Sequence, residues 1–165
     1  MDSIAFTPIG VIRTPHESLE GMPIQPTGAK GVLGRIELKP ELGPGLKDLD
    51  GFSHAILLYC FHESRGYELE LTPFMDVTPR GLFSTRAPRR PNPIGLSVVR
   101  VLSVDADKGL LEVQDVDLLD GTPILDIKPL IPKVDCPGGE LRAGWLQEAQ
   151  ERMKDRRADD RFIEE

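Results

Sequence analysis

Apolar and polar residues alternate over short stretches of this chain, and turn residues separate one stretch from the next. Residues 34–39 place Ile36 and Leu38 between charged side chains, which is the pattern of a half-buried β-strand. Residues 55–61 are apolar throughout and have the length of a central strand. The pattern predicts further strands over residues 4–12, 82–84, 96–104, 110–117 and 124–131. We therefore expect a mainly β protein.

Turn residues are distributed along almost the whole chain. Its 16 glycines and 15 prolines interrupt nearly every potential helix before the C-terminal region. Short strands joined by many turns are typical of small β-barrels. Asp107, Lys108 and Gly109 form a hairpin signal between two of the predicted strands. The predicted fold is a small closed or partly open β-barrel of short strands.

Two features interrupt the strand pattern. The alternation breaks near Asp115, which predicts a β-bulge that re-aims the neighbouring side chains. A single helical turn is expected over residues 46–49, and Gly51 is expected to end it.

The pattern changes towards the C-terminus. Residues 143–154 are predicted to form an amphipathic helix, because their apolar side chains recur on one side at helical spacing. These side chains are Trp145, Leu146, Ala149 and Met153. We expect the chain to divide into a β-barrel domain over residues 1–135 and a C-terminal α-helix with a charged tail over residues 136–165, packed on or beside the barrel.

Length and composition bound the class of protein. A chain of 165 residues is expected to form one domain with its own core. Hydrophobic residues make up 39% of it and charged residues 28%, which is ordinary for a soluble globular protein. No apolar run approaches the ~20 residues that span a bilayer, and the N-terminus has no signal-peptide pattern. We expect a cytoplasmic protein with no membrane partner.

Common metal-binding and nucleotide-binding motifs are missing from the sequence. The two cysteines, Cys60 and Cys136, have no metal-ligand spacing, and we expect two buried thiols and no bound metal. There is no Gly-x-Gly-x-x-Gly, no phosphate-binding loop and no His-Glu-x-x-His. A doubly wound nucleotide-binding fold is therefore disfavoured.

The most distinctive stretch covers residues 84–101. It carries four arginines and no acidic residue, in a chain whose net charge is −7. Its prolines fix φ and restrict the residues before them, so we expect a stiff, extended loop that leads through Gly95 into the next strand. A proline-rich surface connection with solvated arginines is the plainer interpretation. The polar side chains that the loop presents are Arg86, Arg89, Arg90 and Asn92.

Aspartates gather in the stretch that follows the predicted hairpin. A carboxylate there can accept the hydroxyls of a ribose, bind an ammonium group or favour a nearby sulfonium cation. Asp120 and Gly121 begin a tight turn with Thr122 that sets backbone amides beside a carboxylate. The alternative is a hairpin turn without function, with Asp126 and Lys128 as a surface pair worth under about 1 kcal/mol. The aspartates concerned are Asp115, Asp117, Asp120 and Asp126.

His62 and Glu63 directly follow the predicted central strand. His62 could stack on an adenine, hydrogen-bond to it or act as a base. A histidine exposed in a polar loop is an equally good interpretation. His54 begins the same strand and is interpreted as structural, and no role is assigned to His16.

Four blocks in order along the chain resemble one known family. The blocks are residues 8–15, 52–62, 84–97 and 117–129. They are similar to the signatures of the TsaA/TrmO-like proteins, which are β-barrel methyltransferases that use S-adenosylmethionine. The likeness covers about residues 4 to 132.

The resemblance implies a homodimer whose cofactor lies in a cleft formed with the partner subunit. The family commonly has an arginine where this chain has Ile24, between the proline and the glutamine of one motif. By matched motif, the implied cofactor contacts are Pro23, Gln25, His62, Glu63, Arg86, Leu96, Asp117, Asp120, Gly121 and Thr122.

The resemblance also implies methylation of the exocyclic nitrogen of threonylcarbamoyladenosine in tRNA, beside the anticodon. His62 and Asp120 are the candidate bases, and the sequence does not choose between them. The tRNA contacts are expected at Arg89, Arg90, Asn92 and Lys128. Two alternatives stay open: a non-catalytic β-barrel that binds nucleic acid, and a methyltransferase that acts on a small molecule.

Overall fold

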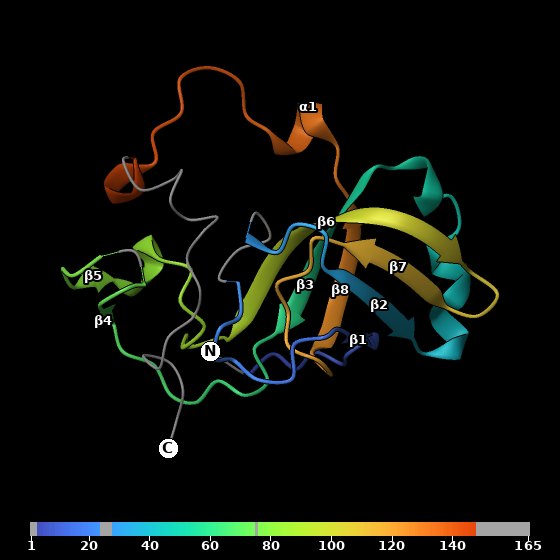
Figure 1. Cartoon of the computed structure of the whole chain (residues 1–165), viewed down its shortest axis with the longest axis horizontal. Coiled ribbons are helices and arrows are strands. Elements are labelled where there is room, and N and C mark those ends of the chain that lie inside the picture. The colour runs from blue at the N-terminus through green and yellow to red at the C-terminus, as the bar shows by residue number, and fades with distance from the viewer. Residues whose placement is uncertain (1–2, 24–27, 75, 148–165) are drawn as a thin grey trace.

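Six antiparallel strands close into a barrel in this computed structural model, which describes residues 3–23, 28–74 and 76–147 (Figure 1). The strand order around the barrel is β1-β2-β7-β6-β3-β8, and β8 pairs with β1 to close it. The mainly β prediction with a closed barrel is therefore confirmed. The strands are β1 (Gly10–Arg13), β2 (Leu33–Leu38), β3 (His54–Cys60), β6 (Ile94–Asp105), β7 (Leu110–Gln114) and β8 (Pro123–Pro129).

A small second unit, here called the satellite, lies beside the barrel (Figure 1). It consists of β4 (Glu70–Leu71), β5 (Arg80–Gly81) and the 3-10 turn η4 (Leu82–Ser84). Its own core is formed by Leu71, Leu82 and Ala87. The predicted strand over residues 82–84 is therefore wrong: these residues form a turn, which buries Leu82 but leaves its neighbours exposed.

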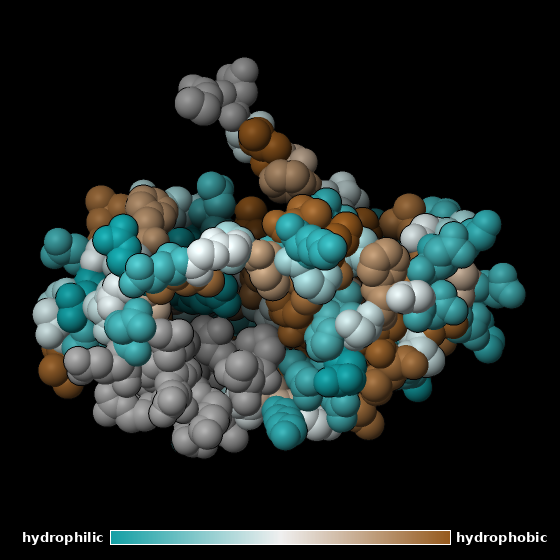
Figure 2. All heavy atoms as spheres, turned by 90° about the horizontal axis from the view of Figure 1, so that it is seen from above, coloured by the Kyte–Doolittle hydropathy of each residue, from teal (hydrophilic) through white to brown (hydrophobic). Residues whose placement is uncertain are grey.

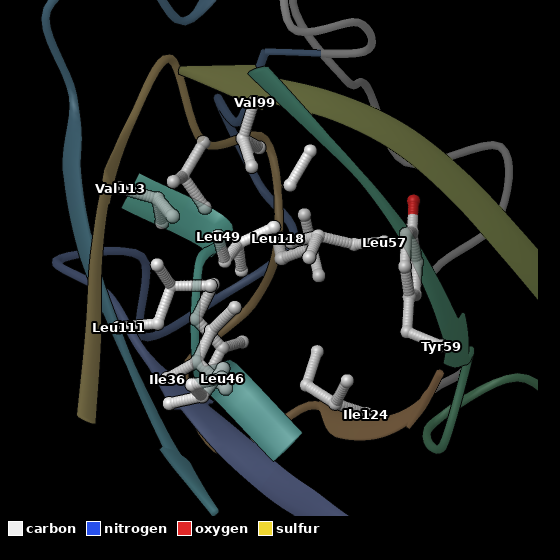
Figure 3. Close-up of a cluster of buried hydrophobic side chains, with 13 residues drawn as sticks. Ile36, Leu46, Leu49, Leu57, Tyr59, Val99, Leu111, Val113, Leu118 and Ile124 are labelled. Carbon is white, nitrogen blue, oxygen red and sulfur yellow. The ribbon is translucent and has the colours of Figure 1, made fainter. Parts of the chain in front are cut away.

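The barrel core follows from alternation along the strands. In β3, Ala55, Leu57 and Tyr59 point inward and are buried, while the residues between them face outward. Val116 and Leu118 come from the loop after β7 and are also fully buried in this cluster. Figure 3 shows these side chains converging from several strands onto one interior. Apolar side chains thus fill the interior of the barrel.

Short 3-10 turns connect β2 to β3. They are η2 (Pro40–Leu46) and η3 (Leu49–Gly51), and they bury Leu46 and Leu49 against the core. The single turn predicted over residues 46–49 is displaced, because Asp48 adopts a left-handed conformation with φ of 67° and separates the two turns.

The strand boundaries at β1 and β7 differ from the predictions. The first strand begins only at Gly10, and residues 3–9 have no regular structure. The strand over 110–117 ends at Gln114. Asp115 has a φ of 69°, and its N–H and that of Val116 both donate to the carbonyl of Val32. That arrangement is the irregularity expected near Asp115, placed at the end of the strand.

Up to residue 147, where the described part of the C-terminal region ends, the structure has one short helix and one turn, α1 (Pro132–Asp135) and η5 (Gly144–Leu146). The helix predicted over residues 143–154 begins as a 3-10 turn, and the part beyond 147 lies outside the described residues. None of the described helices is both long and apolar enough to cross a membrane.

Trp145 anchors this C-terminal region to the satellite. Its indole nitrogen donates to the carbonyl of Ser84 at 2.9 Å, and the Arg80 guanidinium lies 5.5 Å from its ring centroid. Figure 1 shows the segment after α1 passing from the barrel to the satellite.

Both cysteines are free thiols. Cys60 is half-buried on the outward face of β3, whereas Cys136 is exposed. The prediction of two buried thiols is therefore wrong for Cys136, which follows α1 at the surface.

Candidate functional site

One end of the barrel, here called the mouth, collects the connections that carry the predicted site residues. Because neighbouring strands are antiparallel, the end of β3 lies beside the starts of β6 and β8. The register shows this directly, since Cys60 pairs with Ile94 and Tyr59 pairs with Ile124. The end of β1 lies at the same place. Figure 2 shows the molecular surface hollowed between the barrel side and the satellite side.

Most of the predicted site residues belong to connections or strand ends at the mouth. Pro23 is buried in the connection between β1 and β2, and Gln25 lies outside the described residues. The other predicted residues in these segments are His62, Glu63, Arg86, Arg89, Arg90, Asn92, Leu96, Asp117, Asp120, Gly121 and Thr122.

Lys128 is the exception. It lies in β8 opposite Ile56, well along the barrel wall from the mouth. Its ammonium is 2.7 Å from the Asp126 carboxylate, which is the surface pair that the sequence allowed as an alternative. A role in binding tRNA stays a prediction for this residue.

Asp117 has the most unusual environment among the predicted residues. Its Oδ1 accepts a hydrogen bond of 2.7 Å from the Ser97 hydroxyl, which in turn lies 3.1 Å from the Tyr59 hydroxyl. Burial raises the pKa of the Asp117 carboxyl to about 6, while the Ser97 hydrogen bond and the Arg86 charge act in the opposite direction. The charge of Arg86 therefore links two segments electrostatically. These are the arginine loop, residues 84–93, and the aspartate stretch, residues 115–126.

Gly95 makes room for this arrangement. A Cβ at Gly95 would collide with the ring of Tyr59, its partner across the strand pair. Gly95 was expected to let the chain turn into the strand, but it lies within β6. The absence of a side chain there leaves room for the Tyr59 ring of the neighbouring strand β3. Burial also raises the pKa of Tyr59, so its hydroxyl stays protonated and can donate.

The loop after Asp117 is fastened to the segment that follows β1. The Thr14 hydroxyl donates to the Leu118 carbonyl at 2.8 Å, and Nε2 of His16 lies 3.3 Å from the Val116 carbonyl. The Thr14 N–H donates to Oδ1 of Asp120 at 3.0 Å. These contacts fix the backbone on which the predicted site aspartates stand.

The polar groups of the turn at Asp120 have hydrogen-bond or ion-pair partners within the protein. Arg13 lies 3.6 Å from Oδ2 of Asp120. Gly121 has a φ of 75° and donates its N–H to the carbonyl of Ile12, and the buried Thr122 hydroxyl donates to the carbonyl of Leu119. The turn is thus a rigid element, and Asp120 supports its geometry as well as carrying charge.

The residues after β3 are more open. Nε2 of His62 lies 4.0 Å from the Glu63 carboxylate, and both side chains reach solvent. The hydroxyl of Ser64 is buried and has no hydrogen-bond partner among the described residues. A buried hydroxyl without a partner is costly, so it marks a position where a ligand polar group would be favourable.

The arginine loop holds one of its arginines inward. Nη1 of Arg90 donates to the carbonyls of Thr85 and Ala87, and its guanidinium lies 5.8 Å from the ring centroid of Phe83. Arg86 and Asn92 are exposed, and Arg89 is half-buried. Arg90 therefore stiffens the loop as well as adding positive charge.

No group of three or more potential metal ligands occurs among the residues that the structure describes. The sequence interpretation missed four residues that shape the mouth: Thr14, His16, Tyr59 and Ser97. Ser97 left a weak signal, because it is a polar residue at an inward position between Gly95 and Val99 of β6. The other three gave none, since their partners are distant in the sequence.

Comparison with known proteins identifies the family. The model of the tRNA-methyltransferase O N-terminal domain matches residues 11–136. This chain belongs to the TrmO family. The similarity extends beyond the domain, since a protein of Pyrococcus abyssi named a probable S-adenosyl-L-methionine-binding protein is 45% identical over 160 residues, covering 97% of this chain and 85% of its own.

Two further relatives of the TrmO family are informative. The tRNA (adenine(37)-N6)-methyltransferase of Escherichia coli is 36% identical over 178 residues, covering 93% of this chain and 74% of its own. A crystal structure of TrmO from Pseudomonas aeruginosa is 36% identical, with a TM-score of 0.72 over 87% of this chain. The chain spans only 63% of that solved structure.

Proposed function

We propose that this chain is an S-adenosylmethionine-dependent methyltransferase that N-methylates threonylcarbamoyladenosine beside the anticodon of tRNA. The observation that carries the proposal is the meeting of the arginine loop and the aspartate stretch at one barrel mouth, where Asp117 is held by Ser97 and senses Arg86. The names of the Pyrococcus and Escherichia relatives support the cofactor and the substrate, respectively.

The donor set at the mouth fits a cationic nucleoside. Asp117 offers a half-buried carboxylate for a ribose hydroxyl, an ammonium group or the neighbourhood of a sulfonium. The Ser64 hydroxyl offers a further polar partner. S-adenosylmethionine would supply the electrophilic methyl group when bound. The residues that would hold it are the ten implied by the resemblance, of which Gln25 lies outside the described residues.

The chain's own contribution to methyl transfer would be mainly positioning. A displacement at carbon needs the nucleophile and the methyl group in line, and a rigid mouth supplies that alignment. A carbamoyl-substituted nitrogen is a weak nucleophile, so a base beside it would help. His62 is the less engaged of the two candidate bases, because Asp120 already accepts the Thr14 N–H and lies beside Arg13.

The arginine loop and the satellite would hold the tRNA. Phe83, in η4 of the satellite, is 76% exposed beside Arg90 of the loop that also carries Arg86 and Arg89. An exposed aromatic ring among arginines suits an unpaired base and its phosphates. This cluster is positive within a protein whose net charge is −7, which favours a local contact with nucleic acid over coating by the whole surface.

A second copy of the chain would complete the site, as the homodimer proposal requires. The outward faces of β3 and β6 carry apolar side chains near the mouth, among them Leu58 and Ile94. Leu96 is 47% exposed there, although the resemblance assigns it to the cofactor. A surface from a partner subunit would cover this face and enclose a ligand beside Leu96. A tRNA substrate further implies a cytoplasmic protein.

The experiment that tests the proposal has two parts. Calorimetry with S-adenosylmethionine should show binding. Incubation with threonylcarbamoyl-containing tRNA, but not with unmodified tRNA, should yield a nucleoside heavier by one methyl group in mass spectrometry. Binding without methylation of tRNA would favour a small-molecule methyltransferase. Binding of RNA without any cofactor affinity would favour the non-catalytic barrel, and either result would overturn the proposal.

A further inference from the structure

Two hydroxyl side chains lie inside the apolar barrel directly behind Asp117. Ser97 is 2% exposed and Tyr59 is 5% exposed, and both belong to the inward faces of their strands. Burying a hydroxyl among apolar side chains is unfavourable unless it is hydrogen-bonded, and an alanine and a phenylalanine would fill the same places without that requirement. Neither residue is among the predicted site residues.

The hydroxyls form a directed chain that ends on the carboxylate. Ser97 donates to Oδ1 of Asp117 at 2.7 Å, so the Tyr59 hydroxyl, 3.1 Å from Ser97, is the donor in the other bond. Successive hydrogen bonds of this kind polarise one another and strengthen the last one. Ser97 engages only Oδ1, so a ligand would be bound through Oδ2.

The hydrogen-bonded chain of hydroxyls is held in place by close packing. The Tyr59 ring crosses Gly95, where any side chain would collide with it, and it contacts Phe61 edge-on at a centroid distance of 5.3 Å. Figure 3 shows the Tyr59 ring at the border of the core cluster, with its hydroxyl oxygen at the far end of the ring. The Tyr59 hydroxyl, which donates to Ser97, is therefore held in position before any ligand binds.

We propose that Ser97, backed by Tyr59, is a positioning residue that orients the Asp117 carboxylate and favours its ionised form for a cationic nucleoside. This inference rests on the proposed function, because it takes Asp117 as a cofactor contact. Ser97 itself touches no cofactor in this proposal and acts through Asp117.

The proposal predicts a direction for the pH dependence of binding. The groups that face Asp117 are Ser97 of β6, Arg86 of the arginine loop and Tyr59 of β3 behind Ser97. Ser97 and Arg86 lower the pKa of the carboxyl, and burial raises it. Removing the Ser97 hydroxyl should therefore raise the pKa of Asp117, so that the carboxylate is lost at a higher pH.

The test is calorimetry with S-adenosylmethionine between pH 5 and pH 8. For the wild-type protein we expect the affinity to fall as the pH drops through about 6. Ser97→Ala should bind about tenfold more weakly at pH 7.5, which is the worth of one hydrogen bond to a charged group. Its midpoint should also move to higher pH. Tyr59→Phe keeps the ring and should shift the midpoint in the same direction by less.

A double-mutant cycle separates positioning from a general structural effect. In an Asp117→Ala background, Ser97→Ala should produce no further loss of affinity. Ser103→Ala, at an exposed serine of the same strand, is the matched control and should leave affinity and midpoint unchanged.

An equal loss from Ser97→Ala in both backgrounds would overturn the inference while leaving the proposed function intact, and so would an unchanged midpoint in both Ser97→Ala and Tyr59→Phe. If the folded wild-type protein binds no S-adenosylmethionine at any pH, the proposed function itself is wrong, and the inference falls with it.

Discussion

At the scale of single residues, Asp117 shows how the fold changes the chemistry of a side chain. An aspartate is ordinarily ionised well below neutral pH, but burial at the barrel mouth raises the pKa of this carboxyl to about 6. The hydrogen bond from Ser97 and the charge of Arg86 act against this rise in pKa and favour the ionised form. Groups with shifted pKa values are concentrated at functional sites, because binding and catalysis require charge states that do not stabilise the fold.

We predict that Asp117→Asn stabilises the protein at neutral pH. Below pH ~4 the carboxyl is protonated in both the folded and the unfolded chain and makes no difference. As the pH rises to about 6, the unfolded chain ionises more easily than the folded one, so the wild-type protein loses stability from this group. The loss is about 3 kcal/mol at most. Urea unfolding at pH 4 and pH 7.5 checks this: the gain from the substitution should be larger at pH 7.5.

Gly95→Ala should destabilise the barrel by about 1–3 kcal/mol, the usual consequence of overpacking. The added methyl group would collide with the Tyr59 ring, which is itself packed in the core. Gly45→Ala is the matched control, because a Cβ there meets no atom within 4 Å. Unfolding free energies of the two variants should differ clearly; similar values would show that the Tyr59 ring can move aside.

At the scale of elements, the loop between β7 and β8 is positioned by the segment that follows β1. Thr14 reaches across to Leu118 and Asp120, although about a hundred residues separate them in the sequence. Val116 and Leu118 add apolar anchors inside the barrel. The loop can therefore carry site residues on a fixed backbone, as preorganised binding requires.

Two substitutions of Asp120 separate its structural role from its charge. Asp120→Ala removes the acceptor of the Thr14 N–H and should cost about 1 kcal/mol of stability as well as weakening S-adenosylmethionine binding. Asp120→Asn keeps an acceptor oxygen, so it should preserve stability yet still weaken binding. Thermal unfolding and calorimetry measure the two effects. Wild-type affinity in the Asn variant would show that the charge has no part in holding the cofactor.

At the scale of the whole molecule, the proposed function would place the cofactor at the barrel mouth and the nucleic acid at the arginine loop and the satellite. The barrel mouth carries the carboxylates, and the arginine loop connects the mouth to the satellite. Trp145 ties the C-terminal region to Ser84 at the start of that loop. A contact from the C-terminal region thus helps to set the position of the arginine loop.

Arg89→Ala should weaken tRNA binding severalfold at physiological salt while leaving S-adenosylmethionine affinity unchanged. The reason is the loss of one positive charge opposite the phosphates. Arg100→Ala is the matched control, an exposed arginine on the barrel wall outside the loop. Fluorescence anisotropy with labelled tRNA measures both variants, and equal effects would argue against a specific role for the loop.

Leu96→Asp should convert a dimer into monomers. A charge on the apolar outer face of β6 would have to be buried against a second copy, which is strongly unfavourable. Sedimentation or light scattering measures the mass, and Leu102→Asp tests whether the effect depends on nearness to the mouth, since Leu102 lies farther along the same strand and is similarly exposed. A wild-type protein that is monomeric at micromolar concentration would contradict the dimer proposal outright.

Much of the barrel could be read from the sequence, because alternation and turn residues are local properties. The strands around Ile36 and Leu57 and the hairpin at Gly109 follow directly from them. The satellite could not be read, since its strands have only two residues each. The predicted strand at 82–84 failed because an apolar residue in a short stretch fits a turn that buries one side chain equally well.

The candidate site could be predicted only in part from the sequence. Residue chemistry and the family resemblance pointed to Asp117 and Arg86, but not to Ser97 or Tyr59. Hydrogen bonds that span 20 and 38 residues depend on strand register, which no local pattern encodes. Lys128 is the opposite case. Its closeness in sequence to the aspartates suggested a place at the site, whereas its position in β8 lies away from the mouth.

Local patterns along the chain specify short antiparallel strands and a proline-stiffened arginine loop, because backbone restriction and side-chain alternation act between neighbouring residues. The closed barrel sets which aspartate is enclosed, which hydroxyls lie behind it and which arginine charge acts on it. Those facts arise when a sheet closes on itself and brings distant strand ends to one mouth, where burial changes the free energy of every charge it encloses.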